Sequence, residues 1–259
     1  MLLAADVGNT HTVFGVFEGE ALQASFRIGS TQGRTSDEWG ATLLQLIRFR
    51  KIEPLAVDAA VLCSVVPPLT GVIVEAIQRY FSIEPLIIGP GVKTGMSILY
   101  DPPQDVGADR IVNGVAAYHR ARGAAIVVDF GTATTFDAIS SKGEYLGGAI
   151  APGIQIGADS LFARAARLPR VEIRRPPAVV GRSTVESIQS GLYFGYASLV
   201  NGMISRIRAE MEPFSNGPIR VFVTGGLGGA LSADLEGIEA VVPDLTLEGL
   251  RLIHQKNRN

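Results

Sequence analysis

Two short stretches of the sequence repeat a pattern of residues that suits phosphate binding. One begins at Asp6 (DVGNTHT) and the other at Asp129 (DFGTATT), and aligning the two aspartates places Gly131 on Gly8, 129 − 6 = 123 residues later. Backbone N–H groups around a glycine turn can bind an anion, and a carboxylate beside them can hold a cation that screens its charge. Two such hairpins facing across a cleft would bind a nucleotide's phosphates from both sides.

The repeat extends beyond these residues. The further matches are Thr132 with Asn9, Thr135 with Thr12, and Gly143-Glu144 with Gly19-Glu20 at 143 − 19 = 124 residues. A separation close to half of the 259 residues predicts a duplicated fold. A single Asp-x-Gly turn is equally typical of an ordinary β-hairpin. The pair at half-chain spacing favours the functional interpretation.

A proline-containing loop, YDPPQDVGADR, lies between the two hairpins and places Asp109 and Arg110 at the start of a predicted helix over residues 105–122. Opposite charges at a helix N-terminus could bind a small anionic substrate and accept a proton from it. In the alternative interpretation, Asp109 stabilises the helix dipole and Arg110 is a solvated partner. An exposed aspartate has a pKa near 4, so we expect Asp109 to be ionised at pH 7.

Three other motifs are weaker. VFVTGGLGG, starting at Val221, predicts a strand that enters a glycine-rich turn, where a base or phosphate could approach the backbone closely. GPGVKT lacks the glycine directly before Lys93 that a Walker A loop requires. The three histidines, His11, His119 and His254, form no spaced cluster, so a zinc site is not expected.

The composition restricts the class of protein. A chain of 259 residues with 47% hydrophobic content can bury one large core or two ordinary ones, and the repeat favours two. A net charge of −2 without a basic patch argues against nucleic acid as a partner. The one cysteine, Cys63, lies in an apolar run, which predicts a buried thiol in a reducing cytoplasm. The N-terminus has no signal-peptide pattern, and the longest uncharged run, residues 187–205, contains polar residues and glycines that argue against a membrane span.

The order of predicted elements is the same in both halves and is typical of a ribonuclease H-like unit. In the first half it comprises strands at 2–8, 12–17 and 21–28, a helix from Ser36, a strand at 59–65, a helix at 69–81 and a strand at 86–88. In the second half it comprises strands around Val127, Thr135 and Leu146, helices at 153–167 and 184–211, a strand at 220–224 and a helix at 247–255. We therefore predict an α/β protein with a duplicated ribonuclease H-like fold: two domains, residues 1–112 and 113–259, around an ATP cleft.

The longest predicted helix, residues 184–211, has two possible roles. Ser183 followed three residues later by Glu186 is the pattern of a capping box. One apolar stripe follows the helix through Ile188, Leu192, Gly195, Leu199, Met203 and Ile207. The stripe could pack inside its own domain or form the interface of a dimer.

Five motifs together resemble type III pantothenate kinase, a family of the actin and hexokinase superfamily of ATP-binding proteins. They are DVGNTHT at 6–12, GPGVKTG at 89–95, YDPPQDVGADR at 100–110, DFGTATT at 129–135 and GGAIAPG at 147–153. The resemblance is ordered and essentially full-length. It implies a kinase that moves the γ-phosphoryl group of ATP onto the primary hydroxyl of pantothenate, giving 4'-phosphopantothenate in the first step of coenzyme A biosynthesis.

The resemblance also implies roles for individual residues. Those implied for ATP binding are Asp6, Val7, Gly8, Asn9, Thr10, His11, Thr12, Val13 and Thr132, with Asp6 near the magnesium ion. Asp109 matches the proton acceptor, and Tyr100, Gly107, Ala108, Asp109, Arg110 and Thr184 match the pantothenate site. Asp129 matches the ligand of a required potassium or ammonium ion. Because Thr184 would reach pantothenate held mainly by the other subunit, the implied protein is a cytoplasmic homodimer with shared sites.

Pro102-Pro103 departs from the Asn-Pro pair that is common at this place in the family. We expect the change to alter the stiffness of the loop and not the chemistry.

The sequence leaves two alternative functions to compare. A kinase of another small acceptor, such as a sugar, would be expected to differ in the loop from Tyr100 to Arg110, which carries acceptor specificity. A non-catalytic transcriptional accessory factor could lose the base, whereas Asp109 is retained.

Overall fold

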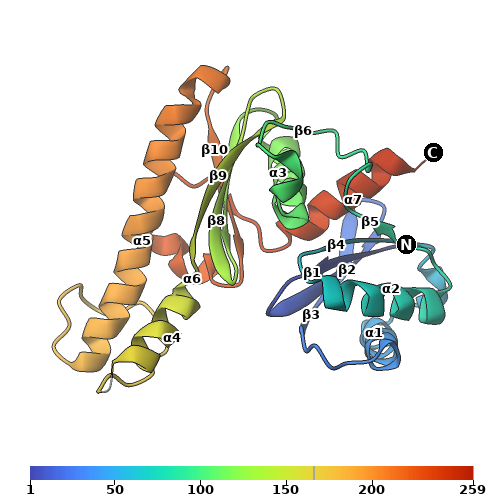
Figure 1. Cartoon of the computed structure of the whole chain (residues 1–259), viewed down its shortest axis with the longest axis horizontal. Coiled ribbons are helices and arrows are strands. Elements are labelled where there is room, and N and C mark those ends of the chain that lie inside the picture. The colour runs from blue at the N-terminus through green and yellow to red at the C-terminus, as the bar shows by residue number, and fades with distance from the viewer. Residues whose placement is uncertain (166, 259) are drawn as a thin grey trace. The chain divides into compact units, whose positions relative to one another are not determined.

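The computed structural model describes residues 1–165 and 167–258, and these form two compact units (Figure 1). Unit 1 comprises Met1–Met96, Asp101–Ala116 and Thr246–Asn259, and unit 2 comprises Ser97–Tyr100 and Ala117–Leu245. This division differs from the predicted domains 1–112 and 113–259 because the chain returns to unit 1 for its last helix. In the described residues, no helix is both long enough and apolar enough to cross a membrane.

The sheet of unit 1 has five strands in the order β3-β2-β1-β4-β5. They are β1 (Leu2–Val7), β2 (His11–Glu18), β3 (Ala21–Gly29), β4 (Ala59–Ser64) and β5 (Leu86–Ile87). The first three form an antiparallel meander, whereas β4 pairs in parallel with both β1 and β5. β1 and β4 are mostly apolar, and most of their residues are buried, as expected for central strands covered on both faces.

Two helices complete the core of unit 1: α1 (Ser36–Phe49) and α2 (Pro67–Phe81), which lie side by side in Figure 1. A capping box starts α1, because Thr35 accepts a hydrogen bond from the Glu38 N–H and the Glu38 carboxylate accepts one from the Thr35 N–H. The side chains of Trp39, Leu43 and Ile47 on α1 are completely buried. Their spacing of four residues places them on one face of the helix, against the apolar core.

The terminal helix α7 (Leu245–Asn257) packs on α3 (Ala108–Ala121), whose first nine residues belong to unit 1. Gly249 allows this approach, since a Cβ atom there would lie 2.2 Å from the carbonyl oxygen of Val112. A short helical turn, η2 (Pro103–Asp105), precedes α3, and another, η1 (Pro54–Ala56), precedes β4. The contact between Gly249 and Val112 is one of those by which the C-terminal segment joins the first unit.

The sheet of unit 2 repeats the order of unit 1 and adds one strand. Its order is β11-β10-β7-β8-β9-β6, with β6 (Ser97–Ile98), β7 (Ala125–Phe130), β8 (Ala133–Ile139), β9 (Glu144–Pro152), β10 (Arg220–Gly225) and β11 (Ala240–Val241). The register shifts between Val16 and Phe17 in the first sheet and between Ala138 and Ile139 in the second, 138 − 16 = 122 residues apart. Gly19 and Gly143 both have positive φ in the turns that follow. The predicted duplicated ribonuclease H-like fold is confirmed.

The helices of unit 2 are α4 (Ile154–Arg164), α5 (Thr184–Met211) and α6 (Gly228–Leu231), with the turns η3 (Glu212–Phe214) and η4 (Ser232–Asp234). The predicted helix 153–167 is therefore shorter, and its residue 166 lies outside the described residues. At the start of α5, Ser183 accepts from the Glu186 N–H, but the Glu186 carboxylate accepts from the Arg182 N–H. The predicted capping box is thus only half formed.

The face of α5 that enters the core overlaps the predicted stripe only in part, since Ile188, Leu192, Met203 and Ile207 contact the core. Tyr193, Ala197, Val200 and Ile204 are buried against the β-sheet, as the course of α5 along that sheet in Figure 1 shows. Within the predicted stripe Leu192 is buried, but Leu199 is 38% exposed and Gly195 is exposed. Part of the stripe is therefore free on the surface of the single chain.

Candidate active site

The first Asp-x-Gly turn connects β1 and β2. The turn is exposed, whereas the strand residues beside it are buried. Val7 pairs with Thr12, so the turn comprises the residues from Gly8 to His11, and the Gly8 N–H donates to the His11 carbonyl at 3.1 Å. Val7 and Thr12 are completely buried, whereas Asn9, Thr10 and His11 are exposed. The middle of the predicted phosphate-binding segment is therefore a solvent-facing turn between two buried residues.

Asp6 is the last charged residue before this turn, and its neighbours shift its acidity. The Cys63 thiol, on the adjacent strand β4, donates to Asp6 Oδ1 at 3.5 Å. Burial, which is the largest cause, and the charge of Asp109 raise the pKa of Asp6 to about 7, although Cys63 and Arg27 act in the opposite direction. Burial also raises the pKa of the Cys63 thiol, which is completely buried as predicted.

Asp109 is the second residue of α3 and is half-buried. Burial raises its pKa, whereas its hydrogen bond from the Arg110 N–H and the Arg110 charge lower it. This corrects the expectation of an exposed aspartate with an ordinary pKa. A Cβ atom on Gly107 would lie 2.5 Å from Asp109 Oδ1, so the glycine leaves room for the carboxylate. Of the other predicted residues, Ala108 is half-buried and Arg110 is buried.

The carboxylates of Asp6 and Asp109 are suited to a cation that takes its remaining ligands from water or a bound molecule. Because the charge of Asp109 raises the pKa of Asp6, a positive ion beside Asp6 would relieve unfavourable charge. No cluster of three or more His, Cys, Asp or Glu side chains that could hold a metal ion occurs in the described part of the chain. Mg²⁺ commonly binds through one or two carboxylates, waters and substrate phosphates. Asp6 could therefore serve as one carboxylate ligand of a magnesium ion that arrives with a nucleotide.

The second Asp-x-Gly turn connects β7 and β8 and is one residue shorter than the first. Phe130 pairs with Thr134, so this turn runs from Gly131 to Ala133, and the Gly131 N–H donates to the Ala133 carbonyl at 3.1 Å. Thr134, and not the predicted Thr135, is therefore the counterpart of Thr12. Thr132, the residue predicted to bind ATP, is exposed in the turn.

Asp129 is half-buried at the end of β7, next to the glycine-rich motif that follows β10. Gly225 has a φ of +87°, and a Cβ atom there would lie 2.5 Å from Asp129 Oδ1. Only glycine adopts this conformation readily and leaves the carboxylate in place. The first glycine of this motif thus makes room for Asp129.

The predicted pantothenate residues fall in different parts of the fold. Gly107, Ala108, Asp109 and Arg110 belong to unit 1, whereas Tyr100 belongs to unit 2. Tyr100 is half-buried, and its ring would lie 3.6 Å from a Cβ atom on Gly147.

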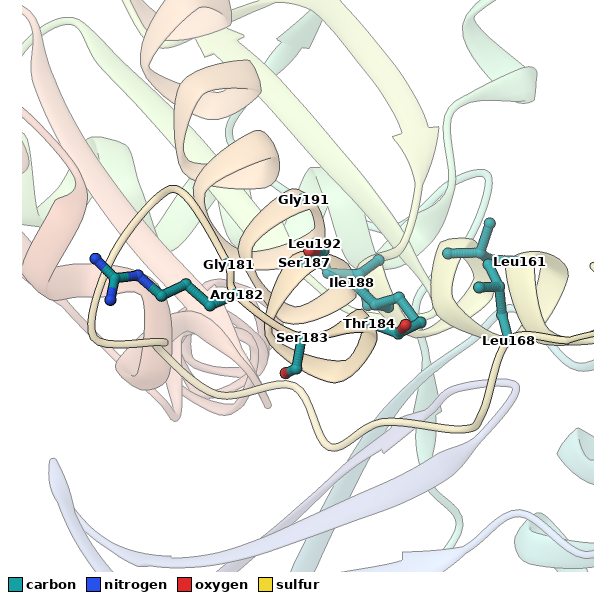
Figure 2. Close-up of a pocket in the computed structure, with 10 residues that line it drawn as sticks. All are labelled: Leu161, Leu168, Gly181, Arg182, Ser183, Thr184, Ser187, Ile188, Gly191 and Leu192. Carbon is teal, nitrogen blue, oxygen red and sulfur yellow. The ribbon is translucent and has the colours of Figure 1, made fainter.

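Thr184, the first residue of α5, lines a pocket of about 730 Å³ in unit 2. Figure 2 shows Leu161 of α4 and Leu168 at one side of this pocket, Thr184 and Ile188 in its middle, and the Arg182 side chain pointing away from them. The pocket therefore combines hydroxyl groups with an apolar wall.

Three contacts in these turns could not be read from local motifs. They are the bond from Cys63 to Asp6, the approach of Gly225 to Asp129, and a set of hydrogen bonds from Ser30 to the first turn. The repeated strand order predicts that β4 lies beside β1 and that β10 lies beside β7. It therefore indicates that Cys63 lies near Asp6 and Gly225 near Asp129. The Ser30 contact depends on the exact end of β3.

A family profile and two similar sequences name the same protein family. Residues 2–206 match the sequence profile described as type III pantothenate kinase. Type III pantothenate kinases of Myxococcus xanthus (strain DK1622) and Moorella thermoacetica are each 53% identical over 257 residues; both alignments cover 99% of this chain, with 99% and 100% of those proteins.

Solved structures agree on the fold. A putative Baf family transcriptional activator from Campylobacter jejuni has a TM-score of 0.60 at 19% identity, covering 98% of both chains. A putative 2-dehydro-3-deoxygalactonokinase from Sinorhizobium meliloti has a TM-score of 0.57 at 12% identity, covering 99% of this chain and 97% of that one. At these identities the likeness shows the fold alone. With the sequence relatives covering its whole length at about half identity, this chain belongs to the type III pantothenate kinase family.

Proposed function

We propose that this chain is an ATP-dependent pantothenate kinase that forms 4'-phosphopantothenate and ADP, the first step of coenzyme A biosynthesis. The observation that carries the proposal is full-length membership of the type III family. The partly buried Asp109, whose charge reaches Asp6 beside the first turn, supports it from the structure. A base near a phosphate-binding turn is what transfer to a hydroxyl requires.

Asp109 is the proposed catalytic residue, because it can orient the pantothenate hydroxyl and accept its proton. Phosphoryl transfer requires little covalent work from a protein, so positioning of the hydroxyl and stabilisation of charge dominate. Burial raises the pKa of Asp109. A raised pKa makes a carboxylate a better proton acceptor near neutral pH.

The proposed ATP site uses the first turn and Thr132. Residues Asp6 to Val13 bind the phosphates through the exposed turn, and Asp6 is near the magnesium ion. Magnesium bound to the nucleotide would neutralise phosphate charge. The chain itself contributes the exposed backbone of the turn and the carboxylate of Asp6. The raised pKa of Asp6 means that a positive charge beside it would be favourable.

Asp129 is the proposed ligand of a monovalent cation, potassium or ammonium. A carboxylate facing a triphosphate would repel it, and a bound cation reverses that local charge. The support is the space that Gly225 leaves beside the second turn, since a Cβ atom there would lie 2.5 Å from Asp129 Oδ1. The remaining ligands would come from water and nucleotide oxygens.

Pantothenate is proposed to bind to Tyr100, Gly107, Ala108, Asp109 and Arg110, with Thr184 supplied by a second copy of the chain. A homodimer is supported by exposed apolar side chains on β9, α4 and α5 of unit 2. They are Ile150, Ile156, Leu161, Phe162, Val185 and Leu199. Exposed apolar side chains that gather into one patch are typical of a protein interface. The cytoplasm is the proposed location, in keeping with the free cysteine.

The direct test is identification of the product. Purified protein, MgATP and potassium are mixed with pantothenate, or with a panel of sugars and short-chain carboxylic acids, and the products are analysed by mass spectrometry. The proposal predicts a phosphorylated product with pantothenate alone. Phosphorylation of another acceptor would support the alternative kinase, and the absence of any product would favour the regulator.

A further inference from the structure

We propose that Ser30 is a positioning residue that fixes the first Asp-x-Gly turn in the shape that binds the ATP phosphates. This inference rests on the proposed ATP site, because it assigns a function to a residue that contacts that turn. Ser30 lies directly after β3, outside every motif that identifies the family.

Three hydrogen bonds connect Ser30 to the turn. Its hydroxyl donates to the Gly8 carbonyl at 2.6 Å, and it shares a second hydrogen bond with the Thr12 hydroxyl at 2.9 Å. Its backbone N–H donates to the Thr10 carbonyl at 3.0 Å. Ser30 thus contacts the turn at its beginning, its middle and the strand residue that follows it.

These bonds are in a position to determine the shape of the turn. Thr12 is completely buried and Ser30 is half-buried, so water competes poorly for the bond between their hydroxyls. Asn9, Thr10 and His11 are exposed and have no core of their own. An exposed turn that must present backbone N–H groups to a ligand binds more tightly when its conformation is fixed beforehand.

The second half of the chain provides an internal comparison. Gly153 occupies the place of Ser30, because its N–H donates to the Thr132 carbonyl at 3.1 Å as that of Ser30 does to Thr10. A Cβ atom on Gly153 would lie 2.2 Å from that carbonyl oxygen. The shorter second turn therefore contacts the backbone of Gly153 directly.

Gly153 has no hydroxyl, and this affects Thr134, the counterpart of Thr12. Thr134 is completely buried, and its hydroxyl is one of the few buried polar atoms without a hydrogen-bond partner among the described residues. The first half avoids this because the Ser30 hydroxyl fills the corresponding place. Both turns thus accept a backbone bond from the residue that follows the third strand, and the longer first turn is held by the Ser30 side chain as well.

Replacing Ser30 by alanine would remove both side-chain bonds and leave the buried Thr12 hydroxyl without its partner. Loss of such bonds commonly changes an equilibrium by about 5- to 30-fold. We expect Ser30→Ala to raise KM for ATP, and Kd for a fluorescent ATP analogue, by about that factor. KM for pantothenate should stay within about twofold, and Ser30→Thr, which keeps the hydroxyl, should restore most of the nucleotide affinity.

The matched control is Thr42→Ala, which removes the hydroxyl bond to the Glu38 carbonyl at 2.6 Å on α1 of the same unit. Thermal melting of both variants separates loss of stability from loss of turn geometry. Ser30→Ala would overturn the inference if it left KM for ATP unchanged, raised both KM values equally, or behaved like Thr42→Ala.

A third variant tests the underlying ATP-site assignment. Gly8→Ala distorts the turn itself, since its Cβ would lie 2.9 Å from the His11 carbonyl oxygen. If Gly8→Ala leaves nucleotide affinity unchanged, the turn is not the ATP site and the proposed function of these residues fails. If Gly8→Ala weakens nucleotide binding and Ser30→Ala does not, only the role of Ser30 is contradicted.

Discussion

The negative charge of Asp109 reaches Asp6 and helps burial to raise the pKa of Asp6 to about 7. The two residues are 103 positions apart (109 − 6) and come from the first strand and a helix of the same unit. A negative charge near a carboxylate disfavours its ionised form and so raises its pKa. This relationship connects the proposed catalytic residue with the proposed magnesium site.

A first prediction concerns the pH dependence of stability. The folded-state pKa of Asp6 is raised from the ordinary 3.8 to about 7, so its contribution to stability is fully present below pH 3.8 and is lost as pH rises through 7. At about 1.4 kcal/mol per pH unit, the loss is at most about 4 kcal/mol. Asp6→Asn should therefore become more stable relative to the parent between pH 5 and pH 8 in urea unfolding without nucleotide. Parallel stability curves would contradict the assignment.

A second prediction concerns catalysis by Asp109. Asp109→Asn should lower kcat by roughly 10²- to 10⁴-fold, the usual range for loss of a general base, with little change in ATP affinity. The control is Asp105→Asn, because Asp105 is an exposed carboxylate in the same loop. Steady-state kinetics at saturating substrates give the comparison, and near-full turnover of Asp109→Asn would exclude it from the mechanism.

A third prediction uses the glycine before Asp109. Gly107→Ala should lower kcat by about tenfold or more, because the new Cβ would lie 2.5 Å from Asp109 Oδ1 and displace it. Gly71→Ala on α2 is the matched substitution, since it has open space and a helical environment that favours alanine. Gly71→Ala should keep full activity with equal or greater stability. Equal activities of the two variants would mean that the Asp109 position is not critical.

A fourth prediction concerns the monovalent cation. Gly225→Ala forces strain at positive φ and places a Cβ 2.5 Å from Asp129 Oδ1, so it should raise the potassium concentration needed for half-maximal activity. Gly229→Ala is the control, because a Cβ atom at Gly229 would have no atom within 4 Å. This variant should need the same potassium concentration as the parent. Activity titrated with potassium chloride at constant ionic strength is the measurement. The same potassium dependence in both variants would separate Asp129 from the ion.

A fifth prediction concerns assembly. Leu199 is 38% exposed on α5, and Leu199→Asp should shift the mass in solution from two chains towards one and raise KM for pantothenate. Leu55→Asp, at a leucine that is 91% exposed in unit 1, is the control and should change neither. Light scattering coupled to gel filtration measures the mass. A Leu199→Asp protein with unchanged mass and kinetics would exclude this face as the interface.

The repeat in the sequence predicted most of the fold because each half contains the same signals in the same order. Buried strands such as β1 and β7 are continuous apolar runs that end in Asp-x-Gly, and the bounds of α5 were predicted as observed. The C-terminal helix was assigned to the wrong unit, because its contact with Val112 depends on Gly249 and has no local signal.

The sequence motifs supplied the residues of the candidate site, but the environment of those residues could not be read from the motifs. The alignment placed Thr135 opposite Thr12 because a single missing turn residue cannot be seen without the strand register, which gives Thr134. The raised pKa of Asp109 could not be predicted, since burial of a helix-start carboxylate depends on tertiary packing. The repeat predicted β10 beside β7, but not that Gly225 leaves room for the Asp129 carboxylate.

The central claim is tested most directly by ADP release in a coupled assay with MgATP and pantothenate, run in potassium and in sodium. The account predicts rapid release that requires both pantothenate and potassium and is lost in Asp109→Asn. ADP release that is independent of pantothenate, or no release in either salt, would contradict it.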